Sequence, residues 1–483
     1  MRIDVLKNKF ILNQLFIFLG IFAFNLILKS IKLDTYPLWY DEMISVKATF
    51  FDFGHIKHQS EWDTNPPFYY YCLWVWVKFF GISEYSVRFM SVLFSSLSSV
   101  FFYLICKKLT KNHIALLATF VYSIHQFIFI YSHEARSYSL LLFLITISTL
   151  LFYKFLEKPN YILGFGLGFV NFLIIYTHYL AGIFLFFQLI VLVVYHKQHY
   201  KEVGIALLTS IVLVFLRFTP KQFKLLFGFH SQTTEESWIK LANTDSLKQL
   251  IYNLFIDKYI AVLIIITIIT GTFYLIKRTK QLNETTKPFF VFIYLTSIGS
   301  IMLFFLMGKF MHIFIDRYII FSVPFIIILL QISLDSIHKH ATLILIPIIC
   351  YQLITLNTET PKSMDFRTAA QVSSILQQKF NGFIIVQTND VAELFTYYYK
   401  RESLENYKKL SENLLSSNVV IIRTFDDLKD INLNSAPVVL CQTFQKETDS
   451  NKIFEFLNSQ DRLFSSTQAV KGVKITLFSR EMR

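Results

Sequence analysis

Two adjacent carboxylates, Asp41 and Glu42, stand in the segment Leu38-Trp39-Tyr40-Asp41-Glu42, shortly after the first long apolar stretch of the chain. A carboxylate at the centre of a bilayer costs roughly 2.5–3.5 kcal/mol, so an acidic pair beside a membrane segment needs a reason. A solvated turn or a helix cap is one reason. General-base catalysis is another, because a positioned carboxylate can take the proton of an attacking hydroxyl.

The composition places this pair in a membrane protein. The chain has 483 residues, of which 54% are hydrophobic and 16% are charged, and several of its apolar runs approach the 20 residues or so that cross a bilayer. The net charge of +13 fits Lys and Arg on cytoplasmic loops, and no basic helix or RNA-type motif favours a nucleic-acid partner. The four cysteines show neither a disulfide framework nor metal-ligand spacing.

Hydropathy predicts a polytopic α-helical membrane protein with about eleven transmembrane helices in residues 1–356. Arg2, Lys7 and Lys9 precede the first helix, and each short loop assigned inside carries Lys, Arg or His, which predicts a cytoplasmic N-terminus. The first outer loop is then 29–84. Two prolines in it favour an interfacial helix over 68–80. A second long outer loop covers 219–258.

Residues 357–483 are more polar and predict a small extracytoplasmic α/β domain, because an odd number of spans leaves the C-terminus outside. Apolar runs typical of strands lie at 382–387, 418–423, 437–441 and 473–478. Runs typical of helices lie at 365–379 and 449–458. The pattern has no phosphate-binding glycine loop, so it leaves the role of this domain open between holding an acceptor and covering the site.

Ionisable residues gather at the predicted outer ends of the spans. The cations among them run against the positive-inside bias: Arg88, Arg136, Arg217, Lys309 and Arg317. Structural ion pairs or contact with lipid headgroups would explain each one singly. An anionic ligand explains the set more simply, because guanidinium groups bind phosphate oxygens bidentately and Lys adds a point charge. The neutral and acidic residues at the same level are Asn65, His133, Glu134, Tyr138 and His178.

Phosphate-binding cations beside carboxylates and apolar aromatic helices predict a lipid phosphate whose chain stays in the bilayer. Sugar transfer from such a lipid needs a base for the acceptor hydroxyl and a cation or metal for the leaving phosphate. It also needs an apolar groove for the prenyl chain, which the Phe-rich spans could supply.

Five motifs on this predicted face carry a family resemblance: LWYDE at 38–42, NPPFYYY at 65–71, SVRFMSVLFS at 86–95, YSHEARSYSLLLFL at 131–144 and YTHYL at 176–180. With them the chain resembles the multi-span GT-C glycosyltransferases that use polyprenyl-phosphate sugars. The resemblance covers about residues 10–330. Within that superfamily the chain is similar to family 39. This branch is related to protein O-mannosyltransferases and aminoarabinose transferases.

The resemblance implies an inverting direct displacement, with Asp41 as the catalytic base and Glu42 beside it. It implies that the Glu134–Arg136 loop is the second polar loop of the site. Among the cations at the outer ends, those that we expect to bind the donor phosphate are Arg136, Lys309, Arg317 and Arg88. Glu134, His133, His178, Tyr138 and Asn65 would support the site or face the acceptor. Many relatives have His where this chain has Asn65, so the resemblance implies no specific role for Asn65.

Metal use is mixed in the superfamily. Asp41, Glu42, Glu134, His133 and His178 could furnish a site for a divalent cation, although no ligand spacing identifies one.

The resulting expectation is a multi-pass glycosyltransferase of the bacterial cytoplasmic membrane. It would move a sugar from polyprenyl phosphate to a glycan, lipid or protein acceptor on the outer face. A glycan polymerase or ligase with a lipid-diphosphate donor is one alternative. A flippase of lipid-linked sugars is the other, and that reading expects half-to-half pseudo-symmetry, which the sequence does not show.

Overall fold

The computed structural model of the chain divides into two compact units, each assembled from several segments. The helical unit comprises Met1–Ile31, Lys57–Cys72 and Arg88–Thr358. The α/β unit comprises Lys32–Ile56, Leu73–Val87 and Glu359–Arg483. The described residues are 2–59, 65–222, 239–278, 284–338, 340–360, 364–387, 392–404, 409–422, 424–429, 431, 433, 436–442, 447–459 and 463–479. Part of the predicted outer loop 219–258 therefore lies outside them.

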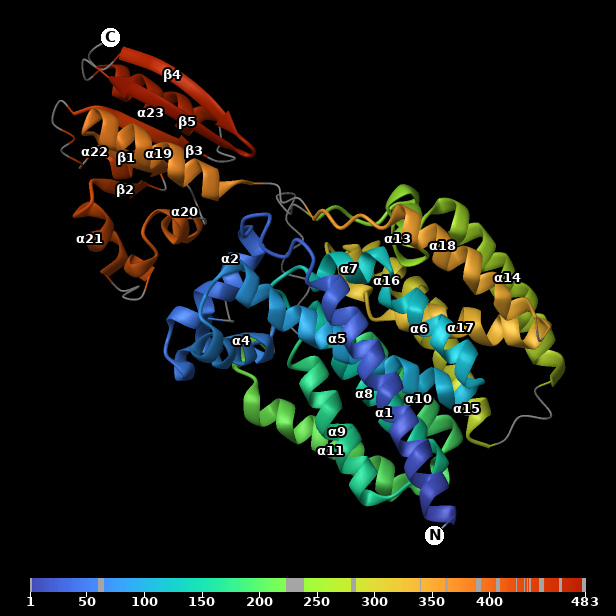
Figure 1. The fold of residues 1–483 in the computed structure, drawn as a ribbon. Helices are drawn as coiled ribbons and strands as arrows, with labels where there is room; N and C mark the ends of the chain where they lie inside the picture. Colours follow the sequence, from blue (N-terminus) through green and yellow to red (C-terminus); the bar gives the residue numbers. More distant parts are fainter. Residues whose placement is uncertain are drawn as a thin grey trace. The chain divides into compact units, whose positions relative to one another are not determined.

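Long apolar helices make up the helical unit (Figure 1). In chain order they are α1 (Arg2–Lys29), α5 (Glu84–Leu109), α6 (Asn112–Ser123), α7 (Gln126–Ser132), α8 (Tyr138–Glu157), α9 (Tyr161–Ile175), α10 (Gly182–Tyr195), α11 (Tyr200–Arg217), α13 (Thr244–Leu254), α14 (Lys258–Arg278), α15 (Thr286–Tyr294), α16 (Ser300–Gly308), α17 (Ser322–Ile337) and α18 (Leu345–Thr355). A π-helical turn, η8 (Leu295–Gly299), joins α15 to α16.

Fewer of the described helices are long enough to span a membrane than hydropathy predicts. Among the described residues, six helices are long and apolar enough to cross a bilayer, and the pair α6 and α7, bent by 57°, would make a seventh. Four further apolar helices are shorter than a full crossing needs. The predicted class, mostly helical with several apolar helices, is confirmed, whereas the predicted count of eleven is not.

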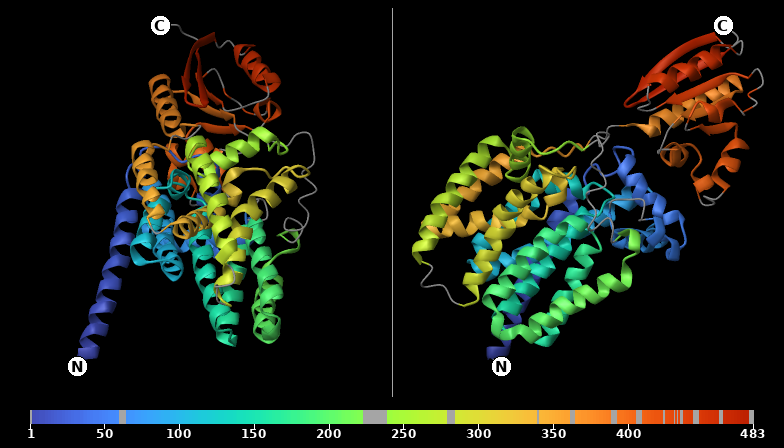
Figure 2. Two further views of the ribbon diagram at one scale, coloured as in Figure 1. Left: turned by 90° about the vertical axis from the view of Figure 1, so that its right-hand side faces the viewer. Right: turned by 180° about the vertical axis from the view of Figure 1, so that it is seen from behind.

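Helices α9 and α11 lie side by side and approach closely at glycines (Figures 1 and 2). A Cβ atom at Gly168 would lie 2.3 Å from the carbonyl oxygen of Ala206 and 2.9 Å from Cβ of Thr209. Gly166, two residues earlier on the same helix, has nothing within 4 Å of such an atom. Gly168 is therefore required by the packing and Gly166 is not; Gly164, where a Cβ atom would lie 2.7 Å from the carbonyl oxygen of Glu202, is required for the same reason as Gly168.

Gly168→Ala is expected to destabilise the protein by about 1–3 kcal/mol, because the added methyl forces α9 and α11 apart. Gly166→Ala is the matched control and should be neutral or mildly stabilising, since Ala is preferred over Gly inside helices. Thermal unfolding of both variants in the same detergent measures the difference. Equal melting temperatures would show that the close approach at Ala206 does not support this helix pair.

The α/β unit contains a five-stranded sheet in the order β2-β1-β3-β5-β4. Its strands are β1 (Phe383–Gln387), β2 (Val419–Ile422), β3 (Val438–Gln442), β4 (Leu463–Val470) and β5 (Val473–Ser479). β1 pairs in parallel with β2 and β3, whereas β5 runs antiparallel to both β3 and β4. The sheet lies in the C-terminal part of the chain, where a small sheet was predicted.

Short helices surround this sheet. They are α19 (Phe366–Phe380), α20 (Ala392–Tyr399), α21 (Leu410–Leu415), α22 (Asp426–Lys429) and α23 (Glu447–Ser459). Ile453 and Leu457 of α23 pack with Ile385 and Leu440 in one buried cluster, and α19 contacts β1, β3 and β5. Strands β1, β3 and β5 are buried along almost their whole length, so the sheet places apolar side chains in the core from both of its faces.

The same unit includes two segments from the beginning of the chain. Helix α2 (Tyr40–Lys47) belongs to it entirely, and α4 (Phe68–Phe80) enters it at Leu73. The first outer loop predicted at 29–84 is therefore grouped largely with the C-terminal residues and not with the helices. The domain limits at 356 and 357 stay a prediction, with the contact boundary falling at Thr358.

Candidate active site

The acidic pair lies in the first turn of α2, in the α/β unit. The Glu42 side chain is fully buried, and its Oε2 accepts a hydrogen bond from the backbone N–H of Trp39 at 3.3 Å. A carboxylate at this position accepts a hydrogen bond from an N–H group that has no acceptor within the helix. The positive N-terminal end of the helix dipole also stabilises its negative charge. Asp41 is only half-buried. Glu42 thus caps the start of α2, and Asp41 is the less buried carboxylate of the pair.

In the helical unit, the residues between α7 and α8 form a tight buried loop. His133, Glu134 and Arg136 are 1%, 5% and 4% exposed, and the N–H of Arg136 donates to the carbonyl of Glu134 at 2.8 Å. Charged side chains are rarely buried so deeply without a partner or ligand. The break between the two helices therefore places a carboxylate, Glu134, and a guanidinium group, Arg136, inside the protein.

A tyrosine and a serine from neighbouring helices hold Arg136, and a second tyrosine contacts that serine. Its Nη1 donates to the hydroxyl of Tyr70 at 3.3 Å, and the hydroxyl of Ser91 donates to its carbonyl at 3.5 Å. The hydroxyl of Tyr69 lies 3.2 Å from that of Ser91. Arg88 stands one helical turn before Ser91 and is 2% exposed. Contacts from the start of α4 and the start of α5 thus place the buried guanidinium groups of Arg88 and Arg136 in one region.

Aromatic rings connect this loop to the segment before α17. Ring centroids are 4.9 Å apart for Tyr131 and Tyr138, 6.1 Å for Tyr138 and His178, and 5.2 Å for His178 and Tyr318. Arg317, beside Tyr318, is close enough to Tyr131 for its charge to act on that side chain, as are Glu134 and Asp316. Residues far apart in the chain thereby meet at one end of the helical unit.

Asp316 has its own support. Its Oδ2 accepts from the amide of Asn253 at 2.6 Å, and its Oδ1 accepts from the N–H of Arg317 at 2.7 Å. The 3₁₀ turn η9 (Asp316–Ile319) is therefore held against the end of α13. The cluster contains arginines and carboxylates together, an arrangement suited to an anion whose charge changes during a reaction.

Sequence and structure comparisons add to this geometry. Residues 64–221, which include the 133–137 loop and its tyrosine partners, match the family of dolichyl-phosphate-mannose-protein mannosyltransferases. The solved structure of ArnT from Cupriavidus metallidurans bound to undecaprenyl phosphate superposes with a TM-score of 0.60 at 11% identity, over 95% of this chain and 97% of that one. This chain has the GT-C glycosyltransferase fold.

Archaeal structures show the same GT-C likeness. The oligosaccharyltransferase AglB from Archaeoglobus fulgidus, in complex with an inhibitory peptide and a dolichol-phosphate, gives a TM-score of 0.53 at 10% identity, over 96% of this chain and 74% of that one. The oligosaccharyltransferase of that organism with Zn and sulfate gives 0.52 at 12% identity, over 95% and 73%. No curated protein matches the sequence. The predicted resemblance to GT-C enzymes is confirmed.

The predicted site residues fall into three groups in this GT-C fold. Those that the contacts above bring into one region of the helical unit are Arg88, His133, Glu134, Arg136, Tyr138, His178 and Arg317. Asp41 and Glu42 belong to the α/β unit. Lys309 is exposed at the end of α16 with its ammonium 4.9 Å from the ring of Phe305, and Asn65 is buried just before α4. Their functional roles stay predictions.

Several residues of the GT-C helical unit were not singled out from the sequence. Tyr69 and Tyr70 lie in the motif NPPFYYY and Ser91 lies in SVRFMSVLFS, and both motifs carried the family resemblance without a role for these side chains. Lys29, fully buried on α1, donates to Ser95, one turn beyond Ser91. The available signal was a polar residue at helical spacing along α5: Arg88, Ser91, Ser95 and Ser99.

Metal ligands do not cluster in the described part of this chain. Within those residues, no three His, Cys, Asp or Glu side chains come close enough together to hold a metal ion. Glu134, His133 and His178 were predicted as donors together with Asp41 and Glu42, which lie in the other unit. A site for a divalent cation therefore stays a prediction, and none of the contacts described above adds support for it.

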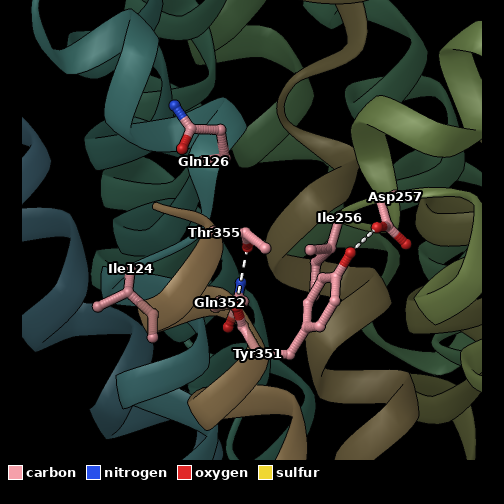
Figure 3. Close-up of a pocket in the computed structure, with 7 residues that line it drawn as sticks. All are labelled: Ile124, Gln126, Ile256, Asp257, Tyr351, Gln352 and Thr355. Carbon is pink, nitrogen blue, oxygen red and sulfur yellow. Dashed lines mark hydrogen bonds between the residues drawn. The ribbon is translucent and has the colours of Figure 1, made fainter. Parts of the chain in front are cut away.

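A separate pocket of about 110 Å³ opens beside the break between α6 and α7 (Figure 3). The residues that line it are Ile124, Gln126, Ile256, Asp257, Tyr351, Gln352 and Thr355. The hydroxyl of Tyr351 donates to Asp257. Burial alone would raise the pKa of Asp257, but this bond and two from the backbone N–H groups of Tyr259 and Ile260 lower it. Asp257 is the only charged residue among those that line this pocket. Its negative charge would repel phosphate, so the pocket does not suit a phosphate ligand.

Proposed function

We propose that this protein is an integral-membrane inverting glycosyltransferase that uses a polyprenyl-phosphate sugar. The observation that carries the proposal is the buried loop with Glu134 and Arg136, tied to Tyr70 and Ser91 in a GT-C fold. Structures with this fold, ArnT and AglB, were solved with undecaprenyl phosphate and a dolichol-phosphate. Buried guanidinium groups are well suited to such a phosphate.

In this proposal the cations receive the phosphate of the donor. Arg136, with its orientation set by Tyr70, would bind two phosphate oxygens, and Arg317 and Arg88 would add charge. Lys309, at the exposed end of α16, would contact the phosphate from solvent. As the bond between the anomeric carbon and the phosphate oxygen breaks, negative charge grows on the phosphate, and these groups stabilise it.

Asp41 would be the general base. An acceptor hydroxyl attacks the anomeric carbon, its proton passes to the Asp41 carboxylate, and polyprenyl phosphate leaves with inversion of configuration. Half-burial of Asp41 and the capping role of buried Glu42 support this assignment of roles. Glu134, His133, His178, Tyr138 and Asn65 would orient the sugar or the acceptor.

We further propose that the protein resides in the bacterial cytoplasmic membrane with its N-terminus inside and its C-terminal domain outside. The acceptor would be a glycan, lipid or protein on the outer face. The positive residues of the short loops support this orientation. Donor synthesis inside and transfer outside would then require the lipid-linked sugar to be moved across the membrane by another protein.

The donor preference tests this proposal against a polymerase or ligase. Purified protein in vesicles should consume a synthetic polyprenyl-monophosphate hexose at least tenfold faster than the diphosphate analogue with the same sugar and chain. Release of polyprenyl phosphate, followed by chromatography, measures the rate. A preference for the diphosphate, or transbilayer movement of intact donor without sugar transfer, would support the polymerase or flippase alternative instead.

A further inference from the structure

Helix α20 of the C-terminal domain contacts the helix that carries Asp41 on both sides of that helix's length, near its start and at its end. At the start of α2, the N–H of Leu38 donates to the hydroxyl of Tyr398 at 2.7 Å. At its end, Nζ of Lys47 lies 2.6 Å from Oε1 of Glu393. Leu38 is fully buried, and the Glu393 side chain is 10% exposed. Lys47 is 32% exposed and Tyr398 is half-buried, so both contacts are partly shielded from solvent, unlike fully exposed ion pairs, which contribute little.

The hydroxyl of Tyr398 reaches a second partner. It is hydrogen-bonded to Glu84, the first residue of α5, whose Oε1 also accepts from Nη2 of Arg367 at 2.7 Å. Burial raises the pKa of Tyr398, and the Glu84 carboxylate raises it further. The phenol thus stays protonated and can donate to Glu84 while it accepts from Leu38.

Arg367 extends the same attachment along the loop before α2. Its guanidinium donates to the carbonyl of Asp34 at 3.1 Å and to that of Thr35 at 3.3 Å. Arg401 donates to the carbonyl of Ile82 at 2.7 Å. Most of these side chains of the C-terminal domain bind backbone carbonyl or N–H groups of the segments around α2. The C-terminal domain therefore fixes the path of the backbone there.

We propose that the C-terminal domain positions the catalytic base, with Tyr398 and Glu393 as positioning residues that hold the Asp41 helix at its two ends. This inference rests on the proposed function for the role of Asp41. A short helix of eight residues is marginal in water by itself, so its orientation depends on these tertiary contacts. A displacement of about 1 Å at a reacting group can cost about 10²-fold in rate.

Tyr398→Phe tests the first contact, and Tyr399→Phe is its matched control. The hydroxyl of Tyr399 donates to Gln377 of α19, within the C-terminal domain, at 2.7 Å. Both variants remove one phenol hydroxyl from neighbouring positions of α20. Tyr398→Phe should lower kcat by about 10- to 10²-fold with the donor KM unchanged, because the base moves and the phosphate-binding residues do not. Tyr399→Phe should keep both constants.

A charge exchange tests the second contact. Lys47→Glu and Glu393→Lys should each lower kcat, and the double variant should recover to within a few-fold of the wild type, because the pair is restored in reverse. A merely structural loss of charge at either position would not be rescued. Failure of the double variant to recover, with all three proteins folded, would overturn the proposal.

Hydrogen exchange separates this inference from the proposed function. In the full-length protein, the backbone amides of residues 38–47 should exchange faster in Tyr398→Phe and Glu393→Lys, and at the wild-type rate in Tyr399→Phe. If the wild type transfers no sugar from polyprenyl phosphate, this faster exchange would show that the function fails while the attachment stands. Unchanged exchange in Tyr398→Phe and Glu393→Lys would overturn the attachment itself.

Discussion

Replacing Asp41 with Asn is expected to lower kcat for sugar transfer by about 10²- to 10⁴-fold, the usual contribution of a general base. Asn keeps the size and polarity of the side chain but cannot accept the proton of the acceptor hydroxyl. The donor KM should change little, because the groups proposed to bind phosphate are elsewhere. Steady-state transfer in vesicles, with the donor varied, measures both constants.

Glu42→Gln provides the control for this experiment. The amide oxygen of Gln can still accept from the N–H of Trp39, so the start of α2 should be retained and the rate should fall less than tenfold. Thermal unfolding should show that both variants are folded. Near-normal turnover of Asp41→Asn together with an inactive Glu42→Gln would assign the base to Glu42 and contradict the division of roles based on burial.

Replacing Arg136 should have the second large effect, on binding of the donor as well as on its reaction. Arg136→Lys keeps the charge but loses the planar fork that matches phosphate, and we expect kcat/KM to fall by about 10²- to 10³-fold. The affinity for undecaprenyl phosphate alone should fall too, because the ground-state phosphate already carries charge. Titration of the lipid into purified protein measures that affinity separately from catalysis.

Tyr70→Phe separates orientation from charge at the same place. It removes the hydroxyl that accepts from Nη1 of Arg136 and leaves the guanidinium in position, so the expected loss is about tenfold or less. Because Arg136 is buried, the stability of each variant must be compared before the rates are interpreted. Normal lipid affinity in a folded Arg136→Lys protein would remove Arg136 from the phosphate site.

Local sequence patterns were enough to predict much of this fold. Long apolar runs marked the membrane helices, and short apolar runs marked four of the five strands. The strand β4, whose sequence is LFSSTQAV, was missed because it lies at the edge of the sheet and contains a run of polar residues. Helix α20 was missed because its aromatic residues do not favour a helix by themselves.

Long-range contacts set the limit of that prediction. The ion pair between Lys47 and Glu393 joins residues 346 positions apart, and neither residue carries a local signal for the other. The grouping of residues 32–56 and 73–87 with the C-terminal domain therefore could not be read from periodicity or composition. The buried His133–Arg136 loop could be predicted, since charged residues at the end of an apolar run stand out, but its tyrosine partners could not.

In the proposed reaction, a sugar passes from a polyprenyl monophosphate to an acceptor by a single inverting displacement. The most direct test supplies the wild-type protein in vesicles with a donor labelled with ¹³C at the anomeric carbon and with an envelope fraction as acceptor. NMR of the product should show the inverted anomer, with one polyprenyl phosphate released per sugar transferred. A retained configuration, or an unconsumed donor, would contradict the account.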